Sequence, residues 1–598
     1  MTEWILRNKK ADFPALEQET GLSRTMCRVL ANRGLTDAEK ARTYLQPQTQ
    51  PLYPAALLKN ADKACELLFA AVRERKRIRI IGDYDVDGVM ATYLLYQALR
   101  TLGAQVDYRI PDRIRDGYGM NMKMVEEAER DRIALLLTCD NGIAAAEPVA
   151  RAKASGMQVI VTDHHDIPCH KEEGVLCYEL PPADVIVNPK QPGETYPQSG
   201  ICGAMVAYKV VCLLFEAAEK EGVFGDRGRK EEVLSELLVP VAFATVCDVM
   251  ELTGENRAAV ARGLSLAQTC QNHGIRALLA VYGLTERNIS AYHAGFLIGP
   301  CFNAAGRLDT ALLGLELLLC GDAAEAEKRA EKLKELNDVR KQMTLEATKT
   351  AQKLAEEALA ENPAQVLVLY LPECHESLAG IVAGRIREQF YLPVIILTKG
   401  ESCIKGSGRS IEGYPMFERL SEQKDLFLAF GGHPMAAGMS LDEKNALLLG
   451  KRLNEAAQLT EEILTRRLYL DAVLPFSEIS EELLAELERL EPFGNGNPKP
   501  LFAASGVRVG GMQRIGREGD SLRLRLTDAA GTTLTGLYFH GADAFEEYLV
   551  KEFGAETVRG VYRGTESVAL TLAFSPAIDE YQGKKYPQII IQEYKRTK

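Results

Sequence analysis

Three short apolar runs in this chain each end in acidic or imidazole side chains. These side chains are Asp83, Asp85 and Asp87 after residues 77–81, Asp140 after residues 133–139, and Asp163, His164 and His165 after residues 158–162. In a parallel sheet the carboxyl ends of the strands lie at one edge, where such sheets bind ligands. The spacing therefore predicts that the three clusters meet in one site.

Carboxylates held this close together repel one another and raise one another's pKa unless a cation lies between them. A divalent metal would relieve the repulsion; the plainer alternative is a set of solvated turn acids, or a cap for a helix that begins near Gly88. Carboxylate and imidazole ligands without thiolate suit Mn²⁺ or Mg²⁺. The number of ligands predicts two ions, which at about 3.5–4 Å apart can hold both oxygens of a displacement at phosphorus.

We assign the candidate roles within this site as follows. The expected ligands are Asp85, Asp87, Asp140, His164 and Asp248, the last from a separate apolar segment. Asp83 belongs to the same metal site and, with Asp163, is expected to orient ligands or water. His165 is expected to face the substrate, either as a phosphate ligand or as a proton donor, so His165 and Asp163 form the catalytic pair.

The composition is that of an ordinary globular protein. The 598 residues are 46% hydrophobic and 26% charged, and they suffice for three or four domains. We expect neither a membrane span nor a signal peptide. Thirteen cysteines without a C-x-x-C pair predict reduced thiols in a cytoplasmic protein. The net charge of −12 gives no sign of nucleic-acid binding, but a local basic groove would not change that total much.

The order of predicted elements indicates an α/β fold. From residue 77 to about 189, β-branched runs alternate with helical stretches, which predicts a parallel sheet with helices on both faces. Residues 200–320 are predicted to be mostly helical. Within them, residues 231–251 form an apolar segment interrupted by Pro240, and residues 239–246 could instead form a buried strand.

The remaining chain is expected to form a long helix, a second α/β lobe and a small barrel. Residues 322–361 repeat apolar positions at a helical period, and Asp322 with Glu325 favours a helix start. This helix is expected to act as a spacer between lobes, although a plain packing helix is the alternative. Residues 364–452 return to α/β alternation, and the chain from residue 467 is rich in predicted strands, which suits a small closed barrel.

Several motifs make the chain similar to a known family. Gly82-Asp-Tyr-Asp-Val-Asp-Gly88 and Asp163-His164-His165 resemble the DHH phosphoesterase superfamily. The segments 109–119, 299–307 and 491–498 resemble its RecJ branch, the single-strand-specific exonucleases. The segments 380–385, 406–410 and 431–438 resemble the DHHA1 lobe of the same family. The motifs occur in order along nearly the whole chain.

This resemblance implies a domain order. We expect an N-terminal helical segment (residues 1–60), a DHH catalytic domain (61–320), a linking helix (321–363), a DHHA1 nucleic-acid-binding domain (364–460) and an OB-fold barrel (465–598). The implied activity is 5′-to-3′ hydrolysis of single-stranded DNA to mononucleotides with Mn²⁺ or Mg²⁺, in DNA repair and recombination. The implied partners are single-stranded DNA, a single-strand-binding protein and a helicase, and no membrane.

The resemblance also implies a set of substrate-binding residues. These are Arg113, Asn303, Arg307, His375, Ser407, Arg409, Gly432 and His433. Arginine can hold a phosphate with two hydrogen bonds, and glycine-rich turns let backbone N–H groups approach it. The plainer alternatives are a surface cation at Arg113, a tight turn at Gly432 and a core histidine at His433.

In the barrel, base stacking and basic side chains are expected to bind a single strand. The candidates are Arg508, Arg514, Arg517, Arg523, Arg525, Arg559 and Arg563, with Tyr538, Phe539, Tyr562, Tyr586 and Tyr594. Ordinary alternating charge on exposed strands is the alternative.

The chain departs from the family pattern at two places. Cys301 stands where members commonly carry arginine, and near His375 an aromatic residue and a glycine are replaced by Cys374 and Ser377. Three other functions remain open from the residues alone: a phosphodiesterase of short oligonucleotides or cyclic dinucleotides, a pyrophosphatase or polyphosphatase, and a non-catalytic replication scaffold of the Cdc45 type.

Overall fold

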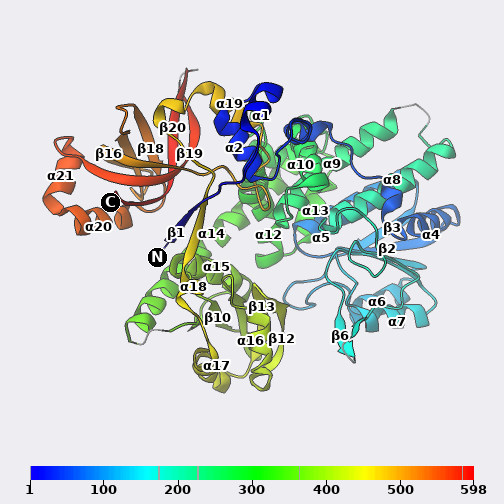
Figure 1. Ribbon diagram of the computed structural model, residues 1–598. Helices are drawn as coiled ribbons and strands as arrows, with labels where there is room; N and C mark the ends of the chain where they lie inside the picture. The colour runs from blue at the N-terminus through cyan, green and yellow to red at the C-terminus, as the bar shows by residue number, and fades with distance from the viewer. Residues whose placement is uncertain (1, 173–174, 225–227, 362–363, 582–583, 598) are drawn as a thin grey trace. The chain divides into compact units, whose positions relative to one another are not determined.

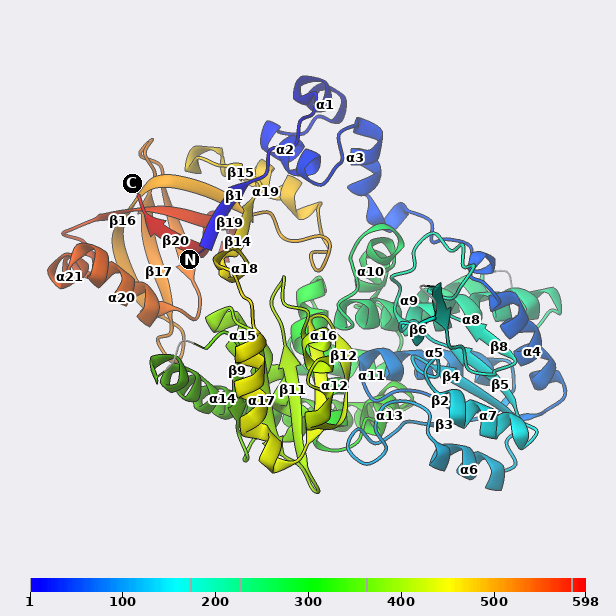
Figure 2. The same ribbon diagram turned by 60° about the horizontal axis from the view of Figure 1, so that its bottom comes forward.

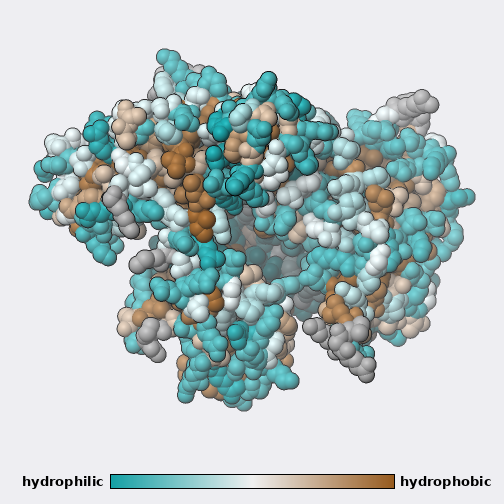
Figure 3. Space-filling model, in the orientation of Figure 1, coloured by the Kyte–Doolittle hydropathy of each residue, from teal (hydrophilic) through white to brown (hydrophobic). Residues whose placement is uncertain are grey.

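The computed structural model describes residues 2–172, 175–224, 228–361, 364–581 and 584–597 (Figure 1). Contacts divide the chain into two units, one formed by residues 51–466 and the other by residues 1–50 together with 467–598. Among the described helices, none combines the length and the apolar character needed to cross a membrane. The face drawn in Figure 3 is largely hydrophilic, with hydrophobic side chains in small groups.

The first lobe of the larger unit, residues 51–319, is built on a parallel sheet with the strand order β3-β2-β4-β5-β8. Its strands are β2 (Arg77–Ile81), β3 (Gln105–Arg109), β4 (Leu135–Cys139), β5 (Gln158–Thr162) and β8 (Val185–Val187). A hairpin of β6 (Cys169–Glu172) and β7 (Val175–Tyr178) lies between β5 and β8 in the chain. The predicted parallel α/β arrangement is therefore confirmed.

Helices cover both faces of this sheet (Figure 2). They are α4 (Ala61–Arg73), α5 (Val86–Thr101), α6 (Met122–Arg130), α7 (Ala146–Ala154) and α8 (Gly203–Lys220). Ile80 packs into one core with α4, α5 and α8, whereas its neighbour Ile81 packs into another with α6 and α7. Because both faces are buried, β4, β5 and β8 are largely apolar instead of alternating with polar residues. Strands β2 and β3 also carry charged residues, and the buried Arg79 of β2 pairs with Asp107 of β3.

The rest of the first lobe is helical, as predicted. The elements are α9 (Arg229–Cys247), α10 (Gly254–Leu266), α11 (His273–Val281), a π-helical turn (His293–Ile298), α12 (Gly299–Leu308) and α13 (Leu312–Leu318). The expected interruption at Pro240 is wrong, and so is the alternative of a strand over 239–246, because α9 continues through both. Val239 and Val241 are fully buried beside the proline, and this packing offsets the one backbone hydrogen bond that proline removes.

Helix α14 (Ala323–Glu361) links the two lobes of the larger unit. Asp322 caps it by accepting a hydrogen bond from the Glu325 amide at 2.8 Å. Its first half, through Ala330 and Leu333, packs into the core of the first lobe, and its second half, through Ala351 and Ala355, packs into the second. The helix is therefore both the predicted spacer and a packing element. Residues 362–363, at the end of the expected linker, lie outside the described residues.

The second lobe, residues 364–466, has a mixed sheet in the order β12-β13-β11-β10-β9. Its strands are β9 (Leu367–Tyr370), β10 (Val394–Lys399), β11 (Ile404–Arg409), β12 (Phe427–His433) and β13 (Ala436–Leu441). Its helices are α15 (Ala379–Phe390), α16 (Met416–Ser421), α17 (Glu443–Ala456) and α18 (Glu461–Leu464). Only β9 and β10 pair in parallel; β10, β11, β13 and β12 pair antiparallel in turn.

The smaller unit contains the predicted closed barrel. Its strands are β16 (Phe502–Ile515), β17 (Ser521–Thr527), β18 (Thr533–Tyr538), β19 (Val568–Tyr581) and β20 (Lys584–Arg596). The additional pairing of β16 with β19 closes the ring. Short strand β15 (Ala472–Val473) extends it, and helices α19 (Glu481–Glu488), α20 (Ala542–Phe553) and α21 (Ala555–Arg563) accompany it.

The N-terminal residues pack with this barrel. Helices α1 (Phe13–Thr20), α2 (Arg24–Asn32) and α3 (Ala38–Tyr44) share one hydrophobic core with it. Strand β1 (Thr2–Leu6), which the sequence analysis did not predict, pairs with β14 (Arg466–Leu470). The expected domain boundaries remain predictions, but the N-terminal helices and the barrel form one folding unit.

Candidate metal centre and adjoining arginine pocket

The acidic and imidazole side chains converge at the carboxyl edge of the parallel sheet. Three sets of ligand atoms lie within 4.8 Å of one another: Asp83, Asp85 and Asp140; Asp140, His164 and His165; and Asp87, His164 and Asp248. Asp140 belongs to two sets and His164 to two, so the sets form one continuous cluster. Residues from four separate segments of the chain thus line a single site.

The turns after the strands leave no room for larger residues. A Cβ atom added at Gly88 would lie 2.6 Å from the backbone nitrogen of Asp83, and one at Gly203 would lie 2.7 Å from the Asp140 Cβ. Asp140 itself has a φ of 61°, in the left-handed region that non-glycine residues rarely occupy. The backbone is therefore held in a costly conformation that brings this carboxylate into the cluster.

Two of the carboxylates are fixed by backbone N–H groups. Asp87 accepts hydrogen bonds from Gly203 at 2.6 Å and Ala204 at 2.7 Å, the first residues of α8. The positive end of a helix dipole favours a carboxylate there. Asp163 accepts hydrogen bonds from the amides of His164 and His165 at 2.7 and 3.1 Å, and from Ile143 at 2.9 Å. Asp163 is thus committed to holding the loop that carries both histidines.

Burial makes the carboxylates of the cluster hard to ionise. Burial, aided by the charge of Asp85, raises the pKa of Asp83 to about 8 and that of Asp87 to about 6. Burial and the Asp87 charge raise the pKa of Asp248 to about 8. The same causes raise the pKa of Asp140 well above its ordinary value. Full ionisation of the site would therefore create negative charge that its protein surroundings do not compensate.

The pKa values of the two histidines are shifted in opposite directions. Burial and the neighbouring His165 lower the pKa of His164 to about 3, so its ring is neutral, which is the form that binds metal. Burial also disfavours charge on His165, but its hydrogen bond to Asp163, at 2.8 Å, and the nearby carboxylates outweigh this and raise its pKa to about 9. For Asp163, burial opposes ionisation, but the bond from His165 and the charges of both histidines lower its pKa.

The polar atoms at the centre of the cluster fit a divalent cation. Asp83 Oδ1, Asp140 Oδ1, Asp248 Oδ2 and His164 Nε2 are buried and have no hydrogen-bond partner among the described residues. Buried polar atoms are nearly always satisfied, so four such unpaired atoms within one cluster of ligand sets indicate that the cluster binds a ligand. Carboxylate oxygen with one imidazole nitrogen is the donor set that Mn²⁺ accepts readily. This geometry also favours Asp83 as a direct ligand, a role the sequence analysis gave to other aspartates.

Asp85 shows that a metal ligand and a helix cap are compatible roles. Its Oδ1 accepts a hydrogen bond from the Gly88 amide at 3.1 Å, so it caps α5 as the alternative interpretation expected. Its carboxylate nevertheless belongs to the cluster with Asp83 and Asp140.

Tyr118 is a site residue that the sequence analysis did not identify. Its hydroxyl donates to the Asp140 carbonyl at 2.6 Å and lies 2.9 Å from His165 Nδ1. Burial and the charges of Asp163 and Asp140 raise its pKa, so it remains a neutral phenol. The signal was present, because Tyr118 lies in the family-like segment 109–119, but nothing in the residues themselves distinguishes it from other tyrosines nearby, such as Tyr108.

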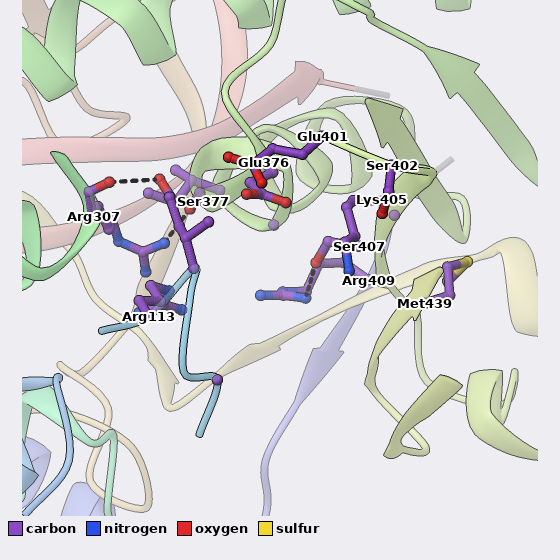
Figure 4. Close-up of a pocket in the computed structure, with 15 residues that line it drawn as sticks. Arg113, Arg307, Glu376, Ser377, Glu401, Ser402, Lys405, Ser407, Arg409 and Met439 are labelled. Atoms are coloured by element: carbon purple, nitrogen blue, oxygen red, sulfur yellow. Dashed lines mark hydrogen bonds between the residues drawn. The ribbon is translucent and has the colours of Figure 1, made fainter. Parts of the chain in front are cut away.

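A cavity of about 500 Å³ lies between the two lobes of the larger unit and collects four of the predicted substrate-binding residues (Figure 4). They are Arg113 and Arg307 from the first lobe and Ser407 and Arg409 from the second. The guanidinium groups of the three arginines point into the same space. Glu376 and Glu401 also line it, yet neither makes an ion pair with these arginines among the described residues.

Each arginine is held by neutral groups instead of by a carboxylate. Arg307 donates to the Ser377 carbonyl, and Arg409 donates to the Gly408 carbonyl at 2.8 Å and to Ser407 Oγ at 3.2 Å. Arg113 lies over the Tyr84 ring, 4.5 Å from its centre. Burial, with repulsion from neighbouring arginines, lowers the pKa of Arg307 to about 9 and also lowers that of Arg409. We call these residues the arginine pocket; its uncompensated positive charge suits an anion.

The other predicted substrate-binding residues lie elsewhere. His375 lines a separate, more apolar cavity beside α14, and its Nδ1 lies 2.8 Å from Ser377 Oγ. Asn303 lies on α12, one turn before Arg307. Gly432 is in strand β12 and not in a tight turn, and an added Cβ would meet the Ala436 carbonyl oxygen, so close packing requires glycine there.

His433 is not a core histidine. Its side chain is 68% exposed, and Nε2 lies 3.5 Å from Asp166 Oδ2, next to the histidine pair of the first lobe. It is therefore free to contact a ligand that passes between the lobes.

Cys301, at the expected arginine position, is buried. Its sulfur lies 3.1 Å from the Tyr282 hydroxyl, and Asn337 of α14 donates to it at 3.7 Å. The side chain thus packs α12 on α14 and adds no charge to the pocket. In the second departure, Ser377 binds His375 and also donates to the Arg307 carbonyl at 3.3 Å, so it supports the pocket wall.

In the barrel, only part of the expected DNA-binding set is available. Arg514 pairs with Asp543 at 2.6 Å and Glu546 at 2.8 Å, so it is not a free cation. Tyr538 and Tyr594 pack with Phe545 in the core. All three side chains are therefore engaged with residues of α20, which weakens the expectation that they bind a strand. Phe539 and Tyr586 are exposed and stay candidates.

Comparisons with known proteins agree with this architecture. The chain matches the model of the DHH family, N-terminal domain, over residues 77–245, the DHHA1 domain over residues 364–465, and the RecJ OB domain over residues 470–593. It is 34% identical to the single-stranded-DNA-specific exonuclease RecJ of Escherichia coli (strain K12), covering 98% of this chain and 97% of the relative. It is 32% identical to RecJ of Bacillus subtilis (strain 168), covering 99% and 70%.

The chain belongs to the RecJ family. The resemblance inferred from the motifs is therefore confirmed, and so is the expected order of DHH, DHHA1 and barrel. Among solved structures, RecJ from Thermus thermophilus in complex with Mn²⁺ is similar with a TM-score of 0.80 and 28% identity, covering 100% of this chain and 80% of that one. The same protein in complex with Mg²⁺ is similar with a TM-score of 0.75.

Proposed function

We propose that this chain is an exonuclease that hydrolyses single-stranded DNA from the 5′ end to mononucleotides, using two Mn²⁺ or Mg²⁺ ions. The observation that carries the proposal is the convergence of four orphaned, buried ligand atoms beside a pocket of uncompensated arginines. One cluster attracts cations and the other an anion, and a phosphodiester substrate needs both. Family membership adds the substrate, single-stranded DNA.

The residues of the metal centre have two roles: some would bind the metal ions, and others position His165. Asp83, Asp85, Asp87, Asp140, His164 and Asp248 would hold the two ions. When bound, such ions polarise the phosphoryl group and activate water. Asp163 and Tyr118 both lie within hydrogen-bond distance of His165 Nδ1 and together position the ring. The pKa of His165, raised to about 9, keeps its ring protonated at neutral pH, so it can donate a hydrogen bond or a proton to a phosphate oxygen.

The arginine pocket would bind the 5′-terminal phosphate. It lies next to the metal centre because Tyr84, whose ring supports Arg113, sits between Asp83 and Asp85 in the chain. A terminal phosphate carries more charge than an internal one and has room only at a strand end. Placing it here sets the bond to be cleaved at the metals one nucleotide away, which accounts for 5′ polarity and a mononucleotide product.

The barrel and its exposed aromatics would bind the strand further along, as OB folds do. We place the protein in DNA repair and recombination in the cytoplasm, acting on strands delivered by a helicase and coated by a single-strand-binding protein. Family membership supports this assignment, and binding assays with the purified partners test it.

The alternative functions fit the chain less well. A phosphodiesterase of short oligonucleotides or cyclic dinucleotides, or a pyrophosphatase, would leave the barrel without a role. A Cdc45-type scaffold has no need for a set of buried carboxylates whose pKa values are raised at a cost to stability.

The deciding experiment uses one oligonucleotide labelled in turn at its 5′ and 3′ ends. With Mn²⁺ the 5′ label should leave at once as a mononucleotide, while the 3′ label moves through a ladder of shorter strands. A chelator should stop both, and a blunt duplex of the same sequence should stay intact. Release of the 3′ label first, or cleavage with chelator present, would contradict the proposal.

A further inference from the structure

Two aromatic side chains stack on each other at the surface of the first lobe. The rings of Tyr292 and Phe296 are 5.1 Å apart between centres, with an angle of 23° between their planes. Tyr292 is 60% exposed and Phe296 is 66% exposed. Among the described residues they are the two most exposed of the large aromatic side chains, and they are exposed as a stacked pair and not singly. We call Tyr292 and Phe296 the aromatic pair.

The aromatic pair is anchored to the helix that carries Asp248. The π-helical turn His293–Ile298 packs on the last turn of α9, where Cys247 Sγ donates to the Ala294 carbonyl at 3.6 Å. A Cβ added at Gly295 would lie 3.3 Å from a methyl carbon of Val246, and one at Gly299 would collide with the Cys247 sulfur. Asp248 follows Cys247 directly. π-Helical turns are rare and often mark functional sites.

The opposite end of α12 reaches the arginine pocket. A Cβ added at Gly306 would lie 2.7 Å from the Tyr84 carbonyl oxygen, and the next residue, Arg307, lines the pocket. From Gly299 to Arg307 the helix rises about 12 Å. One end of α12 therefore touches the Asp248 side of the metal centre, and the other touches the Asp83–Asp85 side. The turn that carries the aromatic pair therefore lies beside the end of α9 that leads to Asp248, whereas the far end of α12 lies beside Tyr84 and the arginine pocket.

We propose that the aromatic pair is a stacking platform for a nucleobase on the 3′ side of the bond that is cleaved. This inference rests on the proposed function and names a binding site within it. A strand whose 5′ phosphate sits in the arginine pocket passes the metal centre and then meets Tyr292 and Phe296. Every base has a flat π face, so stacking holds a strand of any sequence. The platform would keep the next nucleotide in line after each product leaves.

The test compares 5′-phosphorylated single strands that are identical except for one abasic residue at the second, third or fourth nucleotide. For the wild-type protein, KM should rise about 5- to 150-fold at the one position that occupies the platform, the range expected for one lost stack. In the double variant Tyr292→Ala, Phe296→Ala, KM for the intact strand should rise by a similar factor. The same abasic substitution should then have no further effect.

Two variants control for indirect effects. The exchange Tyr292→Phe, Phe296→Tyr keeps both rings and should keep the wild-type abasic penalty. Leu447→Ala removes an exposed apolar side chain on α17 and should leave KM unchanged. Mn²⁺ binding by calorimetry should be the same in all variants, which verifies that the end of α9 is intact.

The outcomes separate this inference from the proposed function. If the wild-type protein degrades no strand, the proposed function fails. If it degrades strands but shows no position-specific abasic penalty, or if the double alanine variant keeps that penalty, the platform is contradicted while the exonuclease stands. A double variant that degrades DNA normally but loses a protein partner would assign the aromatic pair to protein docking and would equally overturn the inference.

Discussion

The metal centre and the arginine pocket are adjacent, and their side chains carry opposite charges. In the first, buried carboxylates repel one another, and their pKa values are raised, to about 8 for Asp83 and Asp248. In the second, half-buried guanidinium groups repel one another, and the pKa values of Arg307 and Arg409 are lowered. Neither cluster neutralises the other, although Tyr84 lies between Asp83 and Asp85 and supports Arg113 with its ring.

This difference indicates that the carboxylates of the metal centre bind a cationic ligand and that the guanidinium groups of the arginine pocket bind an anionic one. Among the described residues Arg113 makes no ion pair, and its guanidinium lies over the Tyr84 ring. Its charge slightly favours ionisation of Asp83, but burial outweighs this and the pKa of Asp83 stays raised. Substitutions that alter one cluster at a time should therefore have different effects on catalysis and on binding.

The largest effect is expected from Asp140→Asn. Asp140 joins two of the three ligand sets, so its loss should lower kcat by at least about 10³-fold, since a bound metal is worth several kcal/mol to the transition state. Calorimetry should show weakened Mn²⁺ binding, while DNA binding in chelator is unchanged. Asp62→Asn, on the exposed surface of α4, is the matched control. A variant that keeps wild-type turnover would remove Asp140 from the metal centre.

His165→Ala should lower kcat by about 10²- to 10⁴-fold, the usual contribution of a positioned acid or base. Because His165 is expected to act on the substrate and not to hold metal, Mn²⁺ binding and DNA binding should stay close to wild type. Stopped-flow single turnover would separate chemistry from product release. Unchanged turnover would refute the assignment, and lost Mn²⁺ binding would make His165 a ligand.

Breaking the other cluster should alter binding instead of chemistry. Arg409→Ala should raise KM about 10- to 100-fold for a 5′-phosphorylated strand and much less for a 5′-hydroxyl strand, because one charge-assisted contact to the phosphate is lost. Arg419→Ala, a surface arginine of the same lobe that pairs with Glu422, is the control. Equal losses on both strands would contradict a terminal-phosphate pocket.

Tyr118→Phe should have a smaller effect, because it removes one hydrogen-bond partner of His165 and leaves the bond that His165 Nδ1 donates to Asp163. We expect a decrease in kcat of about 10-fold with KM unchanged, as for other groups that orient a catalytic side chain. The pH profile should also change, since the His165 ring loses one neighbour. A variant with wild-type kcat at every pH would show that Asp163 alone positions the ring.

The smallest effect is one of stability and depends on pH. Carboxylates whose pKa is raised on folding stabilise the native state below their unfolded pKa, near 4, and this stability is lost as pH rises through their folded values, here about 6 to 8. The metal-free protein should therefore melt a few degrees lower at pH 8.5 than at pH 6. Added Mn²⁺ should raise the melting temperature more at pH 8.5. The reverse trend would mean that the carboxylates are already compensated.

Local patterns in the sequence predicted the metal centre but not the pocket. Strands β2 and β5 were predicted with the bounds that the structure has, because each contains a run of β-branched residues that is buried in the sheet. Each then ends in acidic or imidazole residues, and one topological rule brings these together. No comparable rule predicts that Arg113, Arg307 and Arg409 lie close together. They come from three distant segments, so only the family resemblance singled them out before the structure brought them together.

Other failures have the same origin in long-range packing. Pro240 was expected to interrupt a helix, but burial of its neighbours outweighs one missing hydrogen bond. Strand β1 was missed because its partner, β14, begins only at Arg466, far along the chain. The aromatic pair gave no signal because tyrosine and phenylalanine at helical spacing are usually core residues.

Anomalous diffraction at the manganese edge, from crystals grown with Mn²⁺, tests the central claim most directly. We expect two peaks about 3.5–4 Å apart, each within bonding distance of Asp140 or His164. A map with no peak there, or with a single ion bound outside this cluster, would contradict the account.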